Sequence, residues 1–338
     1  MSSMPLFRVA RRFAAALAFV TLAAGAAAAQ EPVKLGYAKC AHCTPLTLVP
    51  ENAKGAKVEA IGFTTGNDVL TALVSKSIDV AQVTYLHYAT ALDRGFDVVA
   101  ISGQVSGGST LLAANDLPVD ADDWTALKAL IAKHKEDGKP FRVAASRGNA
   151  QDIHMRGAFA KQGIDVNKDV TFVNIPNPSD HIQALRRGEV EMICTVEPFG
   201  TQILQSKGAK LFTHPYDQPA GRLTNLMVTR SDMIASNPEG VQAVVGGVVA
   251  VNEKISADKG LWADVIVKVT GLDRKIAEGA IGNLYPDAPM HRPEAIAIAG
   301  MMRDLKYISK DVTAKVEANM DYSFLEAATG KPKTELGY

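Results

Sequence analysis

The sequence predicts an α/β protein with two lobes, each a small and mostly parallel open sheet with helices on both faces. Residues 66–83 and 178–195 both read as a helical stripe, a short polar turn and a β-rich run, and Asp68 and Asp180 mark their common offset of 112 positions. Short β-rich runs alternate with helical patterns, which is typical of parallel sheets. A length of 338 residues also allows two cores. Two repeated α/β units leave a cleft between them, where ligands commonly bind.

The first 29 residues have the pattern of an export signal. Arg8, Arg11 and Arg12 precede an apolar run over residues 13–24, and small residues continue to Ala29. The apolar run is shorter than the roughly 20 residues that span a bilayer. We therefore expect a secreted, periplasmic protein that is cleaved near Ala29.

Composition excludes several classes of function. The formal net charge is 0, and removal of the signal takes away three arginines and no acid. A nearly neutral chain without basic clusters gives no reason to expect nucleic acid as a partner. No zinc-protease, nucleophile-elbow, phosphate-loop or dinucleotide-binding motif occurs, so we expect no enzyme activity, no catalytic residues and no cofactor. We expect a monomer.

The expected strands follow one another in two parallel series. Those of the first lobe are Val33–Tyr37, Val58–Phe63, Ile78–Val83 and Val98–Ser102. Those of the second lobe are Phe141–Ser146, Val170–Ile175, Val190–Thr195 and Lys210–Thr213. Each series ends with one more apolar run, Ser109–Ala114 or Asn225–Thr229, which we interpret as a strand that crosses to the other lobe. Two crossing strands would form a hinge that permits rigid-body closure.

The remaining segments complete the predicted organisation. The first part of lobe 1 is expected at 30–114, a helical bridge followed by lobe 2 at 115–228, and a return to lobe 1 at 229–329. Helical spacing in the return segment covers Val241–Val251, Ile276–Leu284 and Pro293–Leu305. The polar residues 330–338 are expected to form a mobile tail.

Three stretches of this sequence resemble a known family. "SIDVAQVTYLHYATALDRGFDVVAISG", "ALRRGEV" and "GEVEMICTVEPFG" are similar to the nitrate, sulfonate and taurine branch of periplasmic solute-binding proteins. The resemblance implies the type II binding-protein fold and a receptor for a small polar or anionic organic solute, such as a sulfonate or taurine. It also implies two partners, the permease of an ABC importer and its ATPase. A pyrimidine-synthesis enzyme of the same fold is an alternative, which the export signal disfavours.

Candidate ligand contacts lie after the carboxyl ends of the strands, where open parallel sheets bind ligands. We expect contacts in the first lobe from Cys40, His42, Thr64, Thr65, Asn67, Tyr85, His87 and Ser106. We expect contacts in the second lobe from Ser146, Arg147, Gly148, Asn149, Asn177 and Glu197. A hydroxyl, a cation and a glycine before a helix suit an oxyanion, although the same residues also suit an ordinary helix cap. Glu197 either contacts a ligand ammonium group or stabilises the start of the next helix.

The first-lobe loop contains an unusual group of cysteines and histidine. Cys40 and Cys43 flank Ala41 and His42, and the third cysteine, Cys194, stands alone in the second lobe. In an exported protein the pair is expected to form a disulfide. Two thiols and an imidazole also suit a soft metal, with Cys194 as a further donor, so a metal- or thiol-binding protein remains a second alternative.

Overall fold

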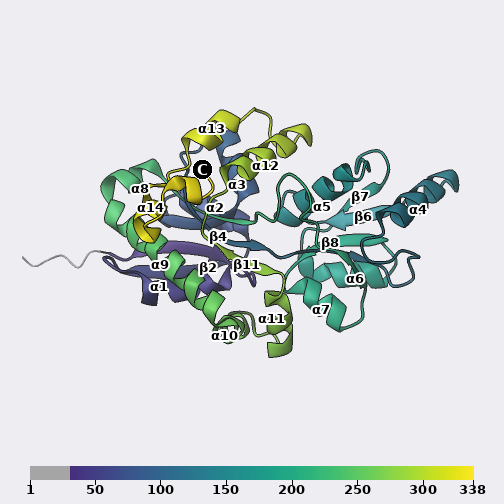
Figure 1. The fold of residues 1–338 in the computed structure, drawn as a ribbon, viewed down its shortest axis with the longest axis horizontal. Helices are drawn as coiled ribbons and strands as arrows, with labels where there is room; N and C mark the ends of the chain where they lie inside the picture. Colours follow the sequence, from purple (N-terminus) through teal and green to yellow (C-terminus); the bar gives the residue numbers. More distant parts are fainter. Residues whose placement is uncertain (1–30) are drawn as a thin grey trace, which may run out of the picture. The chain divides into compact units, whose positions relative to one another are not determined.

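Two β-sheets organise residues 31–338, the part of the chain that the computed structural model describes (Figure 1). The predicted export signal lies outside these residues. Within them, no helix is both long enough and apolar enough to cross a membrane.

The first sheet has six strands in the order β11-β4-β10-β3-β1-β2. Their bounds are β1 Val33–Ala38, β2 Val58–Phe63, β3 Val80–Thr84, β4 Val99–Gly107, β10 Asn225–Thr229 and β11 Leu284–Asp287. The strands β2, β1 and β3 are parallel, whereas β10 runs antiparallel to both β3 and β4. The four strands predicted for this lobe are all present.

The second sheet has five strands in the order β7-β6-β8-β5-β9. Their bounds are β5 Ser109–Ala113, β6 Arg142–Ala145, β7 Thr171–Asn174, β8 Met192–Val196 and β9 Lys210–Thr213. The strands β7, β6 and β8 are parallel, and β5 runs antiparallel to β8 and β9. This order repeats the order β2-β1-β3-β10-β4 of the first sheet, so the sequence repeat corresponds to a repeat of topology.

Both predicted crossing strands are confirmed. β5 follows β4 of the first sheet directly along the chain but pairs within the second sheet. β10 follows β9 of the second sheet but pairs within the first. Each sheet therefore contains one inner strand that is supplied by the other half of the chain.

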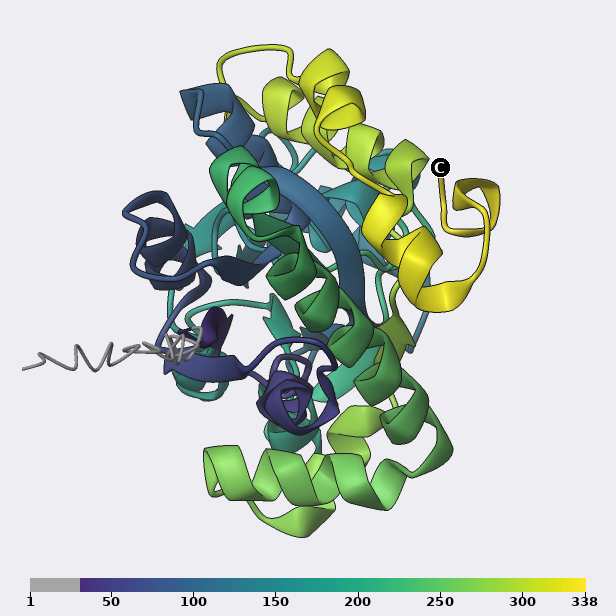
Figure 2. The ribbon, with the colours of Figure 1, turned by 90° about the vertical axis from the view of Figure 1, so that its left-hand side faces the viewer.

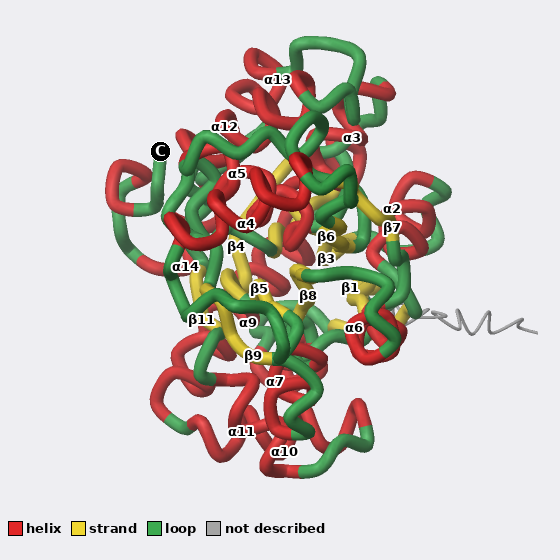
Figure 3. Tube along the Cα trace, turned by 90° about the vertical axis from the view of Figure 1, so that its right-hand side faces the viewer, coloured by secondary structure: helices red, strands yellow, loops and turns green. Residues whose placement is uncertain are grey.

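Helices cover both faces of the second sheet (Figure 3). Leu111, Val143 and Cys194 share one hydrophobic cluster with the helix residues Met155 and Phe159. Their sequence neighbours Leu112, Ala144 and Ile193 belong to a separate cluster with Leu185 and Ile203. Alternation of side chains along a strand places the two clusters on opposite faces. The helices of this region are α4 Trp124–Glu136, α5 Ala150–Lys161, α6 His181–Arg186 and α7 Phe199–Gln205, with the 3-10 helix η2 at Pro178–Asp180.

The C-terminal helices pack on the first sheet and share its hydrophobic cluster. The 20-residue helix α9, Pro238–Ala257, contributes six valines, one alanine and one isoleucine to the described core and contacts β1, β2 and β4 (Figure 2). The helices near the N-terminal part of this sheet are η1 Thr44–Leu48, α1 Val49–Asn52, α2 Gly66–Val74 and α3 Tyr85–Arg94. The later ones are α8 Ser231–Ser236, α10 Lys259–Thr270, α11 Arg274–Ile281, α12 Arg292–Asp304, α13 Thr313–Ala318, α14 Ser323–Thr329 and η3 Lys333–Glu335.

Two local predictions were wrong. The helix expected at Ile276–Leu284 ends at Ile281, and Leu284 begins β11, which pairs antiparallel with β4 at the edge of the first sheet. The expected mobile tail is instead docked: Leu336 is buried, and the carbonyls of Leu336 and Gly337 accept hydrogen bonds from the backbone N–H groups of Met290 and Arg292. The side chain of Leu336 anchors the tail. The polar composition of residues 330–338 as a whole gave no sign of this contact.

The turn from β4 into β5 requires glycine. Gly107 and Gly108 have φ values of +89° and +84°, which are unfavourable for side-chain-bearing residues. A Cβ on Gly107 would lie 2.5 Å from the carbonyl oxygen of Asn283, a backbone atom with little freedom to move. The first crossing therefore depends on these two residues.

We expect Gly107→Ala to lower the free energy of unfolding by about 2 kcal/mol or more, because strain and a backbone clash act together. A Cβ on Gly246 of α9 would have no neighbouring atom within 4 Å, so Gly246→Ala is the matched control and should stabilise the protein by about 0.5–1 kcal/mol. Urea denaturation of both variants measures the difference. Equal stability of the two variants would contradict the role assigned to Gly107.

Candidate functional site

The two crossing segments lie side by side at the junction between the sheets. Thr224 Oγ1 donates to the carbonyl of Gly107 at 2.7 Å, and the N–H of Gly107 donates to the carbonyl of Arg222 at 2.7 Å. Loops from both halves contact these segments. Glu197 donates its N–H to the carbonyl of Gly108, and Tyr85 donates its N–H to the carbonyl of Thr224. The carboxyl ends of β3 and β8 thus meet at the hinge.

The carboxylate of Glu197 is buried at this junction. One oxygen accepts from Thr110 Oγ1 at 3.1 Å and the other from the N–H of Thr201 at 2.9 Å, in the first turn of α7. Burial raises the pKa of Glu197, and these hydrogen bonds oppose the rise. The interaction with the helix start, one of the two roles that the sequence left open, is therefore present. A contact with a ligand ammonium group stays a prediction.

His154 of α5 links the second lobe to both crossings. Its Nδ1 lies 2.7 Å from Ser109 Oγ, and its Nε2 lies 3.0 Å from the carbonyl oxygen of Leu223. A carbonyl only accepts, so Nε2 carries the proton and Nδ1 accepts from the serine hydroxyl. Burial lowers the pKa of His154 to about 4, which keeps the ring neutral at physiological pH.

The loop between β6 and α5 contains the predicted oxyanion contacts. Arg147 is exposed, and its guanidinium lies 5.1 Å from the ring centroid of Phe172. Gly148 has a φ of +76°, and Asn149 precedes α5 without a side-chain cap. The hydroxyl of Ser146, in contrast, is buried and donates to the carbonyl of Ile175. Arg147 and the start of α5 therefore remain available to an anion, whereas the Ser146 hydroxyl already has a partner.

Asp152 holds this loop and was not singled out in the sequence. Its carboxylate is fully buried and accepts hydrogen bonds from Gly148 N at 3.0 Å, Arg156 Nε at 2.7 Å and Tyr307 Oη at 2.5 Å. Tyr307 follows α12, which packs with the first sheet, so Asp152 joins the predicted ligand loop to the other lobe. Burial and the negative charge of Asp152 raise the pKa of Tyr307. An acid in the first helical turn with arginine four residues later was the available signal.

The first-lobe candidates after β2 lie on an exposed edge. Thr64, Thr65 and Asn67 are exposed, and Thr65 forms a capping box with Asp68 at the start of α2. His87 is 7% exposed and its Nδ1 lies 2.8 Å from Thr84 Oγ1. A Cβ on Gly66 would lie 2.8 Å from the His87 ring, so this histidine is adjacent to the same helix start.

Two other candidates already have local hydrogen bonds, and a third is buried in a strand. Tyr85 is 2% exposed, and its hydroxyl donates to the carbonyl of Met290 in the interior of the first lobe. Ser106 is also buried, in β4 opposite Tyr285 of β11. Asn177 is exposed and caps η2 by accepting from the N–H of Ser179. Ligand contacts by these three residues stay predictions.

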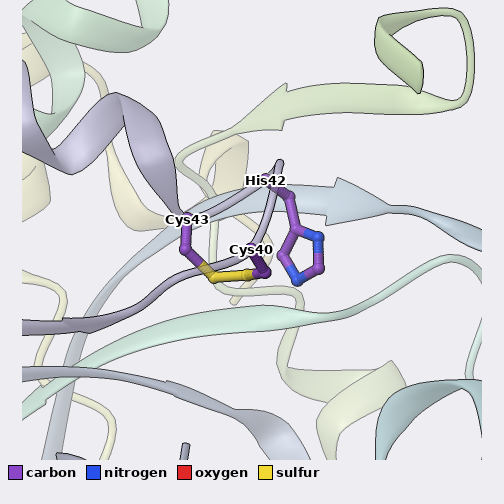
Figure 4. A group of neighbouring side chains, drawn as sticks. All are labelled: Cys40, His42 and Cys43. Atoms are coloured by element: carbon purple, nitrogen blue, oxygen red, sulfur yellow. A yellow bond between two sulfur atoms is a disulfide. The ribbon is translucent and has the colours of Figure 1, made fainter. Parts of the chain in front are cut away.

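The cysteine loop is closed by a disulfide between Cys40 and Cys43, beside the ring of His42 (Figure 4). His42 is 4% exposed, its Nδ1 has no hydrogen-bond partner among the described residues, and burial lowers its pKa to about 4. A Cβ on Gly108 would lie 3.4 Å from that Nδ1, so the ring reaches the first crossing. Cys194 is fully buried in the core of the second lobe and does not join this group.

The structure brings together some predicted residues and separates others. His42 and Glu197 meet at Gly108, and His87 meets the helix start at Gly66. Within residues 31–338, no hydrogen bond joins Thr64, Thr65 or Asn67 to the second-lobe candidates. A cavity of about 560 Å³ lies elsewhere, between Gly157 and Lys161 of α5 and Met301 of α12, and includes none of the predicted contacts.

Residues 26–270 match the model of the NMT1-like family. The chain belongs to the NMT1-like family. This membership confirms the resemblance that the sequence motifs indicated.

Solved structures share the fold of this NMT1-like chain at low sequence identity. The periplasmic nitrate-binding protein NrtA from Synechocystis PCC 6803 superposes with a TM-score of 0.73 at 17% identity, over 90% of each chain. The periplasmic aliphatic sulphonate binding protein SsuA from Escherichia coli has a TM-score of 0.68 at 17% identity, over 85% of this chain and 91% of SsuA. The predicted type II binding-protein fold is therefore confirmed.

A curated relative matches over a shorter region. The nitrate/nitrite binding protein NrtA of Synechococcus elongatus is 32% identical over 82 residues, which are 24% of this NMT1-like chain. The match spans only 18% of that relative's length, so it does not transfer an activity.

Buried neutral histidines predict how stability depends on pH. Burial lowers the pKa values of His42, His87 and His154 to about 4, whereas an unfolded chain titrates near 6.5. Between those pH values the unfolded state binds protons that the native state does not, so stability should fall as the pH drops from 6.5 towards 4. Urea denaturation at pH 7, 6 and 5 measures the trend. A free energy of unfolding that is constant over this range would contradict it.

Proposed function

We propose that this chain is the periplasmic receptor of an ABC importer and captures a small polar or anionic organic solute between its two lobes. The pair of exchanged strands β5 and β10 carries this proposal. They join two α/β sheets at a hinge where the carboxyl ends of β3 and β8 meet. Helix starts and loops at such ends are the usual anion-binding elements of open α/β sheets.

The solute would act by stabilising a closed arrangement. Contacts from both lobes exist together only when the lobes approach, so a ligand shifts the equilibrium by its differential affinity. The hydrogen bond from Tyr307 to Asp152 would contribute to the same state, since it joins the C-terminal helices of the first lobe to the start of α5. Asp152 also holds Gly148, which would couple lobe contact to the ligand loop.

The chemistry of the second-lobe loop supports an anionic group on the solute. Arg147 supplies an exposed cation, and the uncapped start of α5 supplies backbone N–H groups and a partial positive charge. A guanidinium suits planar oxyanions through paired hydrogen bonds. Sulfonates, taurine and nitrate are the first candidates, because the similar structures are those of a sulphonate-binding and a nitrate-binding protein.

The partners would be an inner-membrane permease and its ATPase. The chain would act as a monomer that the permease recognises in its closed form, and it would not act as an enzyme. Similarity to binding proteins supports this assignment. Co-purification with a candidate inner-membrane permease tests the partnership.

Arg147→Ala is expected to weaken solute binding by about tenfold or more, because a charge-assisted contact is lost. A thermal-shift screen of sulfonates, taurine, nitrate and related anions identifies a stabilising compound, and calorimetry then compares affinities. Arg187→Ala is the matched control. Arg187 is an exposed arginine in the turn after α6, and it precedes β8, so it lies at the amino ends of the parallel strands, whereas Arg147 lies at their carboxyl ends. Equal affinities of the two variants would remove Arg147 from the site.

Tyr307→Phe is expected to lower solute affinity by about three- to tenfold, because it removes a contact between the lobes. Tyr322→Phe is the control, since the Tyr322 hydroxyl donates to Gly337 within the first lobe. The Tyr322→Phe variant should have a changed free energy of unfolding but an unchanged affinity for the solute. A Tyr307→Phe variant that binds like the wild type would show that the bond does not contribute to closure.

A further inference from the structure

The Cys40–His42–Cys43 loop contains three soft or borderline donors that the solute-binding proposal does not need. The two sulfurs and one ring nitrogen of His42 all lie within 4.8 Å of one another. In a tetrahedral zinc site, Zn–S and Zn–N bonds of about 2.3 and 2.0 Å place neighbouring donors roughly 3.5–3.8 Å apart. Once the disulfide is broken, the two sulfurs would have to move apart and the ring nitrogen would have to move closer to them, through side-chain rotation, to reach this geometry.

The surroundings of His42 favour a ligand there. The ring is 4% exposed, and its Nδ1 is buried without a hydrogen-bond partner among residues 31–338. A buried polar atom without a partner carries a desolvation cost that is ordinarily avoided in native structures. Figure 4 places Nε2 rather than Nδ1 on the side of the two sulfurs, so a cation there would bind Nε2, and Nδ1 would carry the proton of the neutral ring.

The disulfide controls whether the site exists, because a cysteine sulfur binds zinc as a thiolate and not as part of a disulfide. We infer that Cys40, His42 and Cys43 form a redox-gated site for a borderline or soft divalent cation such as Zn²⁺, closed in the disulfide form and open in the dithiol form. The site shares Cys40 and His42 with the solute contacts expected from the sequence, but its metal binding does not depend on the proposed solute.

Reduction would proceed by thiol–disulfide exchange with a dithiol reductant. Cys40 is partly exposed whereas Cys43 is 1% exposed, so the attacking thiolate bonds to the sulfur of Cys40. The bond between the two cysteines breaks, and the sulfur of Cys43 leaves with the electron pair, 3.8 Å from Asn225 Nδ2. The second thiol of the reductant then displaces Cys40. The protein gains two electrons and two protons, and the reductant becomes a disulfide.

Metal binding to the reduced loop then needs no further oxidation or reduction. Zn²⁺ displaces the two thiol protons and bonds to two thiolates and one neutral imidazole nitrogen. Three protein donors leave a fourth position for water or another small ligand.

The test compares oxidised and reduced forms of the wild-type chain. The protein is reduced with a dithiol, desalted under anaerobic conditions and titrated with Co²⁺ and then with Zn²⁺ against a competing chelator. We expect one equivalent to bind the reduced form about 100-fold more tightly than the oxidised form, with thiolate-to-cobalt absorption bands. Equal binding by the two forms, or no binding by the reduced form, would overturn the inference.

Variants then identify the donors. His42→Gln should weaken Zn²⁺ binding by the reduced protein at least about tenfold, because one ligand is lost. His134→Gln, which changes a histidine of α4 in the other lobe, should leave it unchanged. Circular dichroism establishes that both variants are folded. A folded His42→Gln protein that binds like the wild type would also overturn the site.

Discussion

The exchange of β5 and β10 between the sheets is the constraint on which the rest of the structure depends. Each is an inner strand, hydrogen-bonded on both sides, so each sheet is complete only when the other half of the chain supplies its strand. The two crossings are tied to each other through Gly107 and Thr224. This places the loops after β3 and β8 at one junction, and the candidate site follows from that placement.

Much of this architecture could be predicted from the sequence because the repeat has a physical basis. The same helix, turn and strand pattern at a constant offset folds into two sheets with the same strand order. The crossing strands were recognisable as apolar runs after polar loops. β11 was not, because Leu284 continues a helical spacing and its strand pairs with β4, which is distant along the chain. Pairing between strands that are far apart along the chain is not indicated by the local sequence pattern.

The candidate site was less predictable, since side-chain direction and partners are set by tertiary packing. Arg147 lies on an exposed loop and Asn67 in the exposed first turn of α2, but the hydroxyls of Tyr85 and Ser146 donate to backbone carbonyls. Asp152, in contrast, was not predicted but has a central position. It lies inside a helix pattern, yet it accepts donors from its own loop, its own helix and the opposite lobe. Only the fold brings Tyr307 to it, 155 positions away along the chain.

Strand exchange also limits how this protein can be divided. A fragment covering residues 115–222 would contain β6, β7, β8 and β9 but not β5, the strand that separates β8 from β9. Its sheet would split into two pieces with bare edges, and such edges promote aggregation. Grafting one lobe onto another scaffold would therefore need the segment 109–113 carried along or its strand supplied in trans. The strands of the second sheet all lie within residues 109–213, whereas the first sheet combines β1 to β4 with β10 and β11 from the end of the chain, so only the second lobe offers a contiguous segment for such a graft.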